Sequence, residues 1–408
     1  MRILVYGINY SPELTGIGKY TGEMASWLAK QGHPVTVVTA MPYYPEWQIH
    51  PAYKGKFWHK EILDGVRIYR CPLYVPETIN SGKRIIHELS FLLSASLVFL
   101  LNLFQKKYDV VISISPPFHL GLLPFLYSKI RSSVLVTHIQ DLQIDAAKDL
   151  GMINNEKLLN LMFSLEKFFL RKSRLVSTIS DGMAKKIENK GVPFKKICFF
   201  PNWVDTSFIK PLQKSESLRK AFGYLNQDII IMYSGNLGEK QGLETLISVA
   251  KYFDEKTDFK FLIVGNGGGR KKLEHLGEEA RLTNLKFFPL QSYENLPALL
   301  ATPDIHLVLQ KKSASDLVMP SKLVSILASG GVSIVTAVEG SSLYRLVKES
   351  KTGILIEPEN TYLLIESIEE TLKQDLFEYR KNARQYAVTV LGKEAIMKNW
   401  ETQLGILT

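Results

Sequence analysis

Short apolar segments alternate with amphipathic ones along the 408-residue chain, and this alternation limits its fold more than any other feature. In the first half, RILVYGI (2–8) is followed by the helix-like stretch 19–33 and then by VTVVTA (35–40). The later apolar segments of this half are DVVISIS (109–115), SVLVTHIQ (133–140), RLVSTIS (174–180) and ICFFP (197–201). Apolar strands separated by helices form parallel sheets that helices cover on both faces, so the pattern predicts an α/β domain.

The same alternation begins again after residue 205. Its apolar segments are residues 229–235, 259–265, 285–290, 304–310, 332–337 and 353–358. Because a chain of this length exceeds what one core accommodates, we predict two doubly wound domains, 1–204 and 205–385, facing a central cleft and joined near 201–211. Residues 386–408 are expected to form a C-terminal helix that packs back on the first domain.

The composition is that of a folded globular protein, with 46% hydrophobic and 22% charged residues. Residues 1–200 carry 25 Lys and Arg against 15 Asp and Glu, a net charge of +10, whereas residues 201–408 carry 25 against 25. A basic half suits nucleic acid, an anionic membrane or a polyanionic substrate. No RNP, zinc-finger or helix-turn-helix pattern accompanies it, so no nucleic-acid partner is expected.

The cysteines and the N-terminus indicate a cytoplasmic protein. Cys71 and Cys198 are far apart and form neither a CxxC pair nor a metal-binding spacing, as in a reducing compartment. The first ten residues, MRILVYGINY, begin directly as a strand, so no signal peptide is expected.

The apolar run LSFLLSASLVFLLNLF (89–104) raises the question of a membrane segment. Its 16 residues are interrupted by Ser94, Ser96 and Asn102 and fall short of the roughly 20 apolar residues that span a bilayer. We favour a helix packed on the N-terminal sheet over one inserted in a membrane. Peripheral attachment to the inner face of the cytoplasmic membrane through the basic half remains open.

Two loops of the first half follow predicted strands, where open parallel sheets bind ligands. In SPELTGIGKYTG (11–22), Gly16 and Gly18 allow backbone N–H groups to approach a phosphate, although a flexible loop has the same composition. In VTHIQDLQID (136–145), His138 and Asp141 lie at a strand end, where a histidine can bond a sugar hydroxyl or stand near a leaving phosphate. A structural histidine is the commoner case.

Two glycine-rich turns of the second half also follow predicted strands. YSGNLGEKQGLETL (233–246) contains Gly235 and Gly238, and its Lys240 can point at an anion held at the following helix. In VGNGGGRKKLE (264–274), glycines again leave the backbone accessible. Both turns are therefore candidates for binding a phosphate.

The stretch DLVMPSKLVSILASGG (316–331) places a lysine at the start of an apolar helix that a double glycine ends. If the helix begins near Ser321, Lys322 and Ser325 share one face because they are three residues apart. Leu323, Ile326 and Leu327 then point into the core. The polar face combines free N–H groups with an ammonium group, which suits a diphosphate.

Taken together and in this order, these segments resemble the GT-B glycosyltransferases, specifically the large retaining family 4. The segments GNLGEKQGLE and VMPSKL…ILASG most resemble those of bacterial enzymes that build colanic-acid-type exopolysaccharides and O-antigens. The resemblance implies two Rossmann-like domains, with a UDP- or GDP-hexose bound mainly by the C-terminal one. It further implies an acceptor glycan or lipid-linked glycan on the N-terminal domain, transfer with retained configuration, and no obligatory metal or other cofactor.

The resemblance also assigns roles to individual residues. Lys240 would neutralise the leaving diphosphate, with Asn236 where many relatives have Arg. Ser325 stands where relatives have a Glu that contacts the ribose, and Asp316 lies near the position of a second acid that touches the transferred sugar. His138 would face the sugar beside Asp141. The implied donor-binding set is Gly16, Gly18, Asn236, Lys240, Gly265, Asn266, Asp316, Met319, Pro320, Ser321, Lys322 and Ser325, and the implied catalytic set is His138, Asp141 and Lys240.

Several alternatives remain open from the sequence. Tyr43, Tyr44 and Trp47, in the aromatic loop 41–58, are candidates for an acceptor-side surface, and an ordinary packed loop explains them equally well. A non-hydrolysing nucleotide-sugar epimerase shares the two-domain architecture. A non-catalytic nucleotide-sugar-binding subunit would explain why Asn236 and Ser325 stand where relatives have Arg and Glu.

Overall fold

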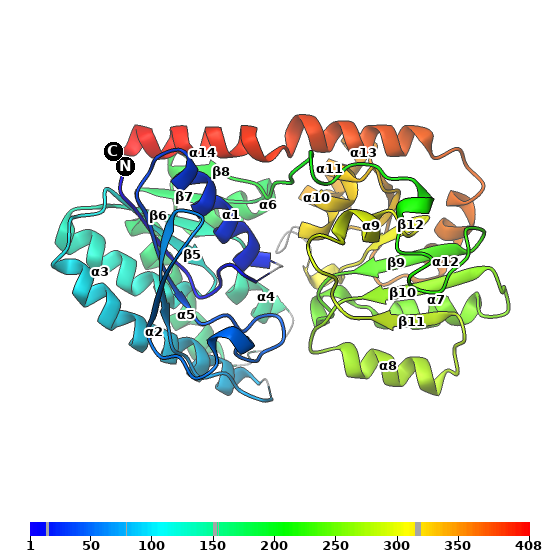
Figure 1. Cartoon of the computed structure of the whole chain (residues 1–408), viewed down its shortest axis with the longest axis horizontal. Coiled ribbons are helices and arrows are strands. Elements are labelled where there is room, and N and C mark those ends of the chain that lie inside the picture. The colour runs from blue at the N-terminus through cyan, green and yellow to red at the C-terminus, as the bar shows by residue number, and fades with distance from the viewer. Residues whose placement is uncertain (14–15, 79, 150–152, 154, 315–319) are drawn as a thin grey trace. The chain divides into compact units, whose positions relative to one another are not determined.

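The computed structural model describes residues 1–13, 16–78, 80–149, 153, 155–314 and 320–408. The chain divides into two compact units, one of Met1–Pro201 with Ile396–Thr408 and one of Asn202–Ala395 (Figure 1). The first boundary lies at 201/202, close to the predicted 204/205. The second lies at 395/396 and not at the predicted 385/386, because α13 (Phe377–Val390) buries Ala383 and Ala387 in the core of the second unit.

The first unit contains an eight-stranded sheet in the order β3-β4-β2-β1-β5-β6-β7-β8, parallel except for the β3–β4 pair. The order reverses between β1 and β5, which makes that point the topological switch where doubly wound sheets bind ligands. The strands are β1 (Ile3–Tyr6), β2 (Val35–Ala40), β3 (His59–Leu63), β4 (Val66–Cys71), β5 (Val110–Ser115), β6 (Val134–Ile139), β7 (Leu175–Thr178) and β8 (Ile197–Phe199).

Helices cover the strands of this sheet, and β1, β2 and β5 are buried along their whole length. Two-sided burial explains why these strands read as continuous apolar runs in the sequence. The helices are α1 (Gly16–Lys30), α2 (Ser81–Leu103), α3 (Leu122–Arg131), α4 (Gln143–Asp149), α5 (Glu156–Lys172) and α6 (Asp181–Asn189). Short 3₁₀ helices are Pro51–Tyr53, Phe118–Gly121 and Phe194–Lys196.

Helix α2 contains the apolar run that raised the membrane question. Within the described residues, Gly82–Leu103 is the helix long and apolar enough to cross a bilayer, with a mean hydropathy of 1.7. One of its faces packs into the core of the first unit through Phe91, Ala95, Val98 and Phe99, as we predicted. The opposite face is exposed, with Leu93 at 73% and Phe104, just after the helix, at 89%.

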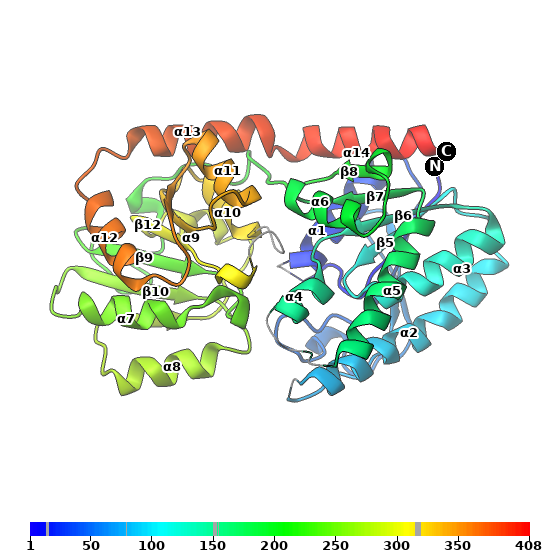
Figure 2. The same ribbon diagram turned by 180° about the vertical axis from the view of Figure 1, so that it is seen from behind.

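The last helix, α14 (Lys393–Leu407), returns the chain to the first unit, where both termini lie (Figures 1 and 2). Its Trp400 is buried and stacks on Phe200 at a centroid distance of 4.3 Å. Glu401 accepts a hydrogen bond from, or pairs with, Nε2 of His33 at 2.7 Å. These contacts fix α14 against residues that precede β2 and follow β8.

The second unit contains a six-stranded parallel sheet in the order β11-β10-β9-β12-β13-β14, a doubly wound order that reverses between β9 and β12. Its strands are β9 (Ile229–Ser234), β10 (Phe259–Val264), β11 (Leu285–Phe288), β12 (Ile305–Val308), β13 (Ser333–Thr336) and β14 (Ile354–Ile356). The remaining helices are α7 (Glu244–Tyr252), α8 (Arg270–Glu279), α9 (Leu296–Leu300), α10 (Ser321–Ala328), α11 (Ser342–Ser350) and α12 (Thr361–Thr371), with 3₁₀ turns at Lys214–Glu216, Glu239–Gln241 and Lys312–Ala314.

Candidate active site

The glycine turns after β9 and β10 touch each other at the carboxyl edge of the second sheet. Gly265 has a φ of 151°, and a Cβ at this position would stand 1.9 Å from the carbonyl oxygen of Gly235. Gly235 has a φ of 133°, and its N–H donates to the carbonyl of Val264 at 2.9 Å. Because only glycine accepts both the backbone angle and the contact, the two turns form one continuous bare-backbone edge beside the switch point.

Lys322 lies beneath this edge, on the first turn of α10. Its Nζ is buried and has no hydrogen-bond partner among the described residues. It stands 3.4 Å from the ring centroid of Tyr233 at the end of β9, and its side chain also packs against Gly235. Burial holds the pKa of Lys322 well below its usual range.

An unpaired buried ammonium is costly, and a cation–π contact of the kind made with Tyr233 offsets only part of that cost. The Tyr233 hydroxyl is directed elsewhere, since it donates to the carbonyl of Asn236 at 2.7 Å. Sequence reasoning placed Lys322 at a helix start, and the tertiary structure adds that its charge lacks a counterion in the described part of the chain. This arrangement is suited to an anion.

The turn that carries Asn236 and Lys240 lies at the same edge. Asn236 is exposed and Lys240 half-buried, in the 3₁₀ turn Glu239–Gln241. The N–H of Gly238 donates to Oε1 of Gln241 at 3.1 Å, and the carbonyl of Lys240 accepts from the N–H of Lys311 at 2.8 Å, which ties this turn to the loop after β12. The structure therefore brings Asn236, Lys240, Gly265 and Lys322 to one edge of one sheet.

Asn266 has its side chain engaged within the turn. Its Oδ1 accepts from Arg270 at 3.1 Å, and the same guanidinium nitrogen donates to the carbonyl of Gly265 at 2.8 Å. The carbonyl of Asn266 accepts from the N–H of Leu237 at 2.9 Å. Arg270 thus holds the turn in place, a role that the sequence pattern did not reveal.

Helix α10 confirms the predicted core positions, whereas Ser325, predicted for the polar face, is buried as well. Leu323, Ile326 and Leu327 are buried in the core of the second unit. Ser325 is 9% exposed, one turn after Lys322, and Pro320 and Ser321 stand at the helix start. Asp316 and Met319, both predicted to bind the donor, lie outside the described residues.

His138, predicted to be catalytic, is a core residue, and that prediction is corrected here. It lies inside β6 with 1% exposure, its Nδ1 is 2.9 Å from the Ser177 hydroxyl, and its Nε2 is 3.1 Å from the Gln140 amide. It packs against Phe200 and Trp400, and burial lowers its pKa to about 3. Both ring nitrogens are occupied within the protein, so neither remains for a substrate.

Asp141 is half-buried directly after β6 and, like His138, lies away from the switch point between β1 and β5. Gly16 has a φ of 59° at the first position of α1, with open space around it. Gly18 was predicted to contact the donor, but a Cβ there would lie 2.5 Å from Oε2 of Glu13. Gly18 therefore makes room for the Glu13 side chain, and its contact with the donor stays a prediction.

The first part of the aromatic loop is packed, which is the alternative left open above, whereas Phe57 and Trp58 at its end are exposed. Tyr43 is buried and lies 4.5 Å from His87 and 5.5 Å from Trp47, measured between ring centroids. Tyr44 and Trp47 are half-buried and pack against the same core. Tyr43 thus does not present its ring as an acceptor surface.

Sequence reasoning missed a polar group at the switch point of the first sheet. Glu13, after β1, is buried; its Oε2 accepts from Asn9 at 3.0 Å, and its Oε1 accepts from the N–H of Tyr44 at 3.2 Å. Burial raises its pKa to about 7. In the sequence, the only sign of this buried polar group is the glutamate itself, directly after Pro12 in the first loop.

His119 and Glu88 belong to the same edge. His119 follows β5, and its Nε2 lies 3.7 Å from Oε2 of Glu88, whose Oε1 accepts from Arg84 at 3.2 Å. Burial lowers the pKa of His119 to about 4 and raises that of Glu88. His119 thus lies next to the switch point of the first sheet, whereas His138 lies within β6. Within the described residues, no group of three or more His, Cys, Asp and Glu could hold a metal ion.

Comparison with known proteins agrees with this architecture. Residues 15–203 match the family described as "Glycosyl transferase 4-like domain", and residues 214–389 match "Glycosyl transferases group 1". The putative colanic acid biosynthesis glycosyl transferase WcaI of Escherichia coli (strain K12) is 42% identical over 410 residues, covering 98% of each chain.

Solved structures share the fold at low sequence identity. Sucrose-phosphate synthase from Thermosynechococcus elongatus superposes with a TM-score of 0.78 at 16% identity and covers 100% of this chain and 99% of its own. Anabaena HepE in complex with UDP and glucose has a TM-score of 0.73 at 15% identity, with 99% of both chains covered. The match to WcaI spans nearly the whole chain, and we conclude that this protein belongs to the GT-B glycosyltransferases of family 4.

Proposed function

We propose that this glycosyltransferase moves a hexosyl group from a UDP- or GDP-sugar to a glycan or lipid-linked acceptor in the synthesis of a bacterial surface polysaccharide. The observation that carries the proposal is the buried Lys322 ammonium, which lacks a counterion among the described residues beneath two glycine turns. A donor diphosphate would supply the missing negative charge. HepE, with the same fold, is described in complex with UDP and glucose.

The proposed chemistry is electrostatic stabilisation of a leaving group. As the bond between the sugar C1 and the phosphate oxygen breaks, negative charge grows on the diphosphate. Lys322 and Lys240 lie at the same edge of the second sheet, so their ammonium groups would stabilise that charge without rearranging. We propose transfer with retained configuration, with a phosphate oxygen of the leaving group taking the acceptor's proton. Neither a metal ion nor another cofactor is required in this scheme.

The acceptor is proposed to bind at the carboxyl edge of the first sheet, around Glu13, His119 and Glu88. These groups lie at that sheet's switch point and combine two carboxyl groups with a neutral imidazole, which suits hydrogen bonding to sugar hydroxyls. The name of WcaI, which refers to colanic acid biosynthesis, supports a polysaccharide acceptor.

We further propose that the first unit docks on the cytoplasmic face of an anionic membrane. Helix α3 contacts both α2 and α5, and the three helices lie side by side in both views (Figures 1 and 2). Together they expose an apolar surface made of Ile86, Leu89, Leu93, Leu97, Leu100, Leu101, Phe104, Leu122, Leu126, Ile130, Leu158, Leu161, Leu165 and Phe168. Lysines and arginines flank it, at Lys83, Arg84, Lys106, Lys107, Lys129 and Arg131.

A surface of this kind combines the two forces that hold peripheral proteins to anionic lipid, apolar burial and attraction of basic groups to the headgroups. The net charge of +10 on residues 1–200 acts in the same direction. We therefore propose that the apolar surface binds an anionic bilayer.

Thermal shift with UDP, GDP and their hexose derivatives tests the donor assignment. A nucleotide at 100 times its Kd stabilises the protein by about 2.7 kcal/mol. We expect stabilisation by one nucleotide series and slow hydrolysis of the matching sugar nucleotide in the absence of acceptor. Absence of stabilisation by every UDP and GDP compound would refute the donor assignment, and NMR of the anomeric proton in the product tests retention.

A further inference from the structure

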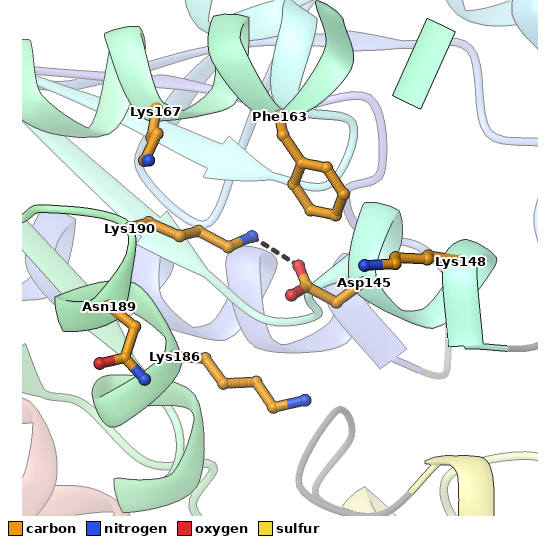
Figure 3. A pocket seen from close by; sticks show the side chains of 7 residues that line it. All are labelled: Asp145, Lys148, Phe163, Lys167, Lys186, Asn189 and Lys190. Atoms are coloured by element: carbon orange, nitrogen blue, oxygen red, sulfur yellow. Dashed lines mark hydrogen bonds and ion pairs between the residues drawn. The ribbon is translucent and has the colours of Figure 1, made fainter. Parts of the chain in front are cut away.

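A pocket in the first unit is separate from the edge residues discussed above. It has a volume of about 360 Å³ and lies among α4, α5 and α6 (Figure 3). Its lining residues are Asp145, Lys148, Phe163, Lys167, Lys186, Asn189 and Lys190. The volume is in the range of small-molecule sites and is larger than a single bound ion needs.

The floor of the pocket is a fixed ion-pair network. Lys190 is buried, donates to Asp145 at 2.5 Å and also forms an ion pair with Glu166. Its ammonium lies 5.1 Å from the ring centroid of Phe163. Lys190 is thus held in one position by two carboxylates, and its charge is balanced within the protein.

The other three lysines have no such balance. Figure 3 shows Lys148, Lys167 and Lys186, from three different helices, arranged around the Lys190–Asp145 pair. None of the three makes an ion pair with a carboxylate in the described part of the chain. Four ammonium groups against the carboxylates of Asp145 and Glu166 leave a net charge of +2. Like charges gathered in a hollow raise the local positive potential and attract an anion.

Phosphate is the anion that this chemistry fits best. A phosphate monoester carries about −1.5 to −2 charges at neutral pH, which matches the net charge of the pocket. Ammonium groups from three helices, with the Asn189 amide, can contact several oxygens at once, while Phe163 supplies an apolar wall. The apolar surface of α5 lies on the opposite side of that helix, about 10 Å away, the width of a helix.

We propose that the pocket of Lys148, Lys167 and Lys186 binds a phosphate or diphosphate group, supplied by the lipid carrier of the acceptor. This assignment rests on the proposed transferase function and specifies its acceptor as one that carries phosphate. A sugar chain whose carrier phosphate is held here is anchored on the same unit as Glu13 and His119.

The test uses inorganic pyrophosphate as the probe and the full chain throughout. Because pyrophosphate would also bind at Lys322, calorimetric titrations are made in the Lys322→Met background, which removes the donor anion site. In that background, the combined change Lys148→Gln, Lys167→Gln and Lys186→Gln is expected to raise the Kd for pyrophosphate at least about tenfold, equivalent to about 1.4 kcal/mol. Lys185→Gln is the matched control, since Lys185 neighbours Lys186 on α6 but does not line the pocket.

The pocket assignment and the donor assignment are contradicted by different results. An unchanged Kd in the triple variant, or an equal loss in the Lys185→Gln control, would overturn the pocket assignment. The triple variant on the otherwise unchanged chain should keep its stabilisation by UDP or GDP, which separates this test from that of the donor site. If no nucleotide binds to any form while the triple variant still loses pyrophosphate, the donor proposal fails and the pocket stands.

A second arm identifies the source of the phosphate. Phosphatidylcholine vesicles with and without a prenyl diphosphate are sedimented with the protein. Tighter binding to the prenyl diphosphate than to pyrophosphate, lost in the triple variant, assigns the pocket to a lipid carrier. Equal affinity for both probes, lost in the triple variant, overturns the lipid source. Vesicle binding that the triple variant retains in full would overturn the assignment to this pocket.

Discussion

The Nζ of Lys322 lies 3.4 Å from the ring centroid of Tyr233, where the end of β9 meets the start of α10. Tyr233 lies on β9, and Lys322 lies on α10, which follows β12 in the chain. Strands β9 and β12 pair with each other and lie on either side of the switch point. The contact thus joins the two loops where a doubly wound sheet binds its ligand. It places a buried amine where a bound anion would favour its charged form.

Lys322→Met should stabilise the ligand-free protein and abolish donor binding. A buried lysine with a lowered pKa costs stability at neutral pH, because folding must discharge or desolvate the ammonium. Methionine of similar length removes that cost, so the Tm of the ligand-free variant is expected to rise by a few degrees, about 2–4 °C per kcal/mol for a domain of this size. Differential scanning calorimetry with and without nucleotide measures both effects, and wild-type nucleotide stabilisation in the variant would contradict the assignment.

Donor binding should take up protons and weaken as pH rises. The lowered pKa of Lys322 favours the neutral amine in the free enzyme, whereas a bound diphosphate favours the charged form and raises that pKa. The complex therefore binds more protons than the free protein between the two pKa values, so Kd increases with pH in that window. Calorimetry in buffers of different ionisation enthalpy reports the proton number, and release of protons on binding would contradict this expectation.

Gly265→Ala should destabilise the second unit and impair donor binding. The new Cβ would stand 1.9 Å from the Gly235 carbonyl oxygen, and a φ of 151° is unfavourable for alanine. We expect a loss of about 2 kcal/mol or more in the free energy of unfolding, measured by urea denaturation. Gly268→Ala is the matched control in the same turn, because no atom lies within 4 Å of its added Cβ. Equal effects of the two changes would argue against the close turn contact.

Substitutions of His138 and of His119 should have different effects on stability and on catalysis. His138→Ala removes a buried ring bonded to Ser177 and Gln140, so we expect a loss of about 2 kcal/mol or more in stability while kcat stays near that of the wild type at a temperature where the variant is folded. His119→Ala, at the switch point, should lower kcat/KM for the acceptor with a smaller loss of stability. Steady-state kinetics and thermal unfolding on both variants check this, and the reverse pattern would restore the catalytic role predicted for His138.

Charges introduced on the exposed face of α2 should weaken membrane attachment. Leu93 is 73% exposed, so Leu93→Glu is tolerated in the fold but places a carboxylate against anionic lipid. We expect binding to phosphatidylglycerol vesicles to fall severalfold with the donor Kd unchanged. Leu225→Glu, at an exposed leucine of the second unit, is the control. Flotation assays that fail to distinguish the two variants would contradict the docking surface.

The periodicity of apolar segments was sufficient to predict two doubly wound units and the buried positions of α10. Buried parallel strands are continuous apolar runs whatever their neighbours, so this information is local in the chain. The same holds for Gly235 and Gly265, where adjacent residues identify a strand-to-helix turn. The pattern did not indicate which polar side chains lie at the switch point. His138 and Asp141 stand near a strand end, as His119 does, and nothing local distinguishes a strand at the switch point from its neighbour.

What the sequence determined by itself is the class of fold and the turns able to approach a phosphate, because hydrophobic period and glycine placement act within a few residues. Only the tertiary structure decided which polar groups have partners. The order of strands in the sheet brings Tyr233 to Lys322 and Glu13 toward Tyr44, and the return of α14 buries His138 under Trp400. Burial and pairing depend on residues that are tens to hundreds of positions apart in the chain, and they set the charge state on which the chemistry rests.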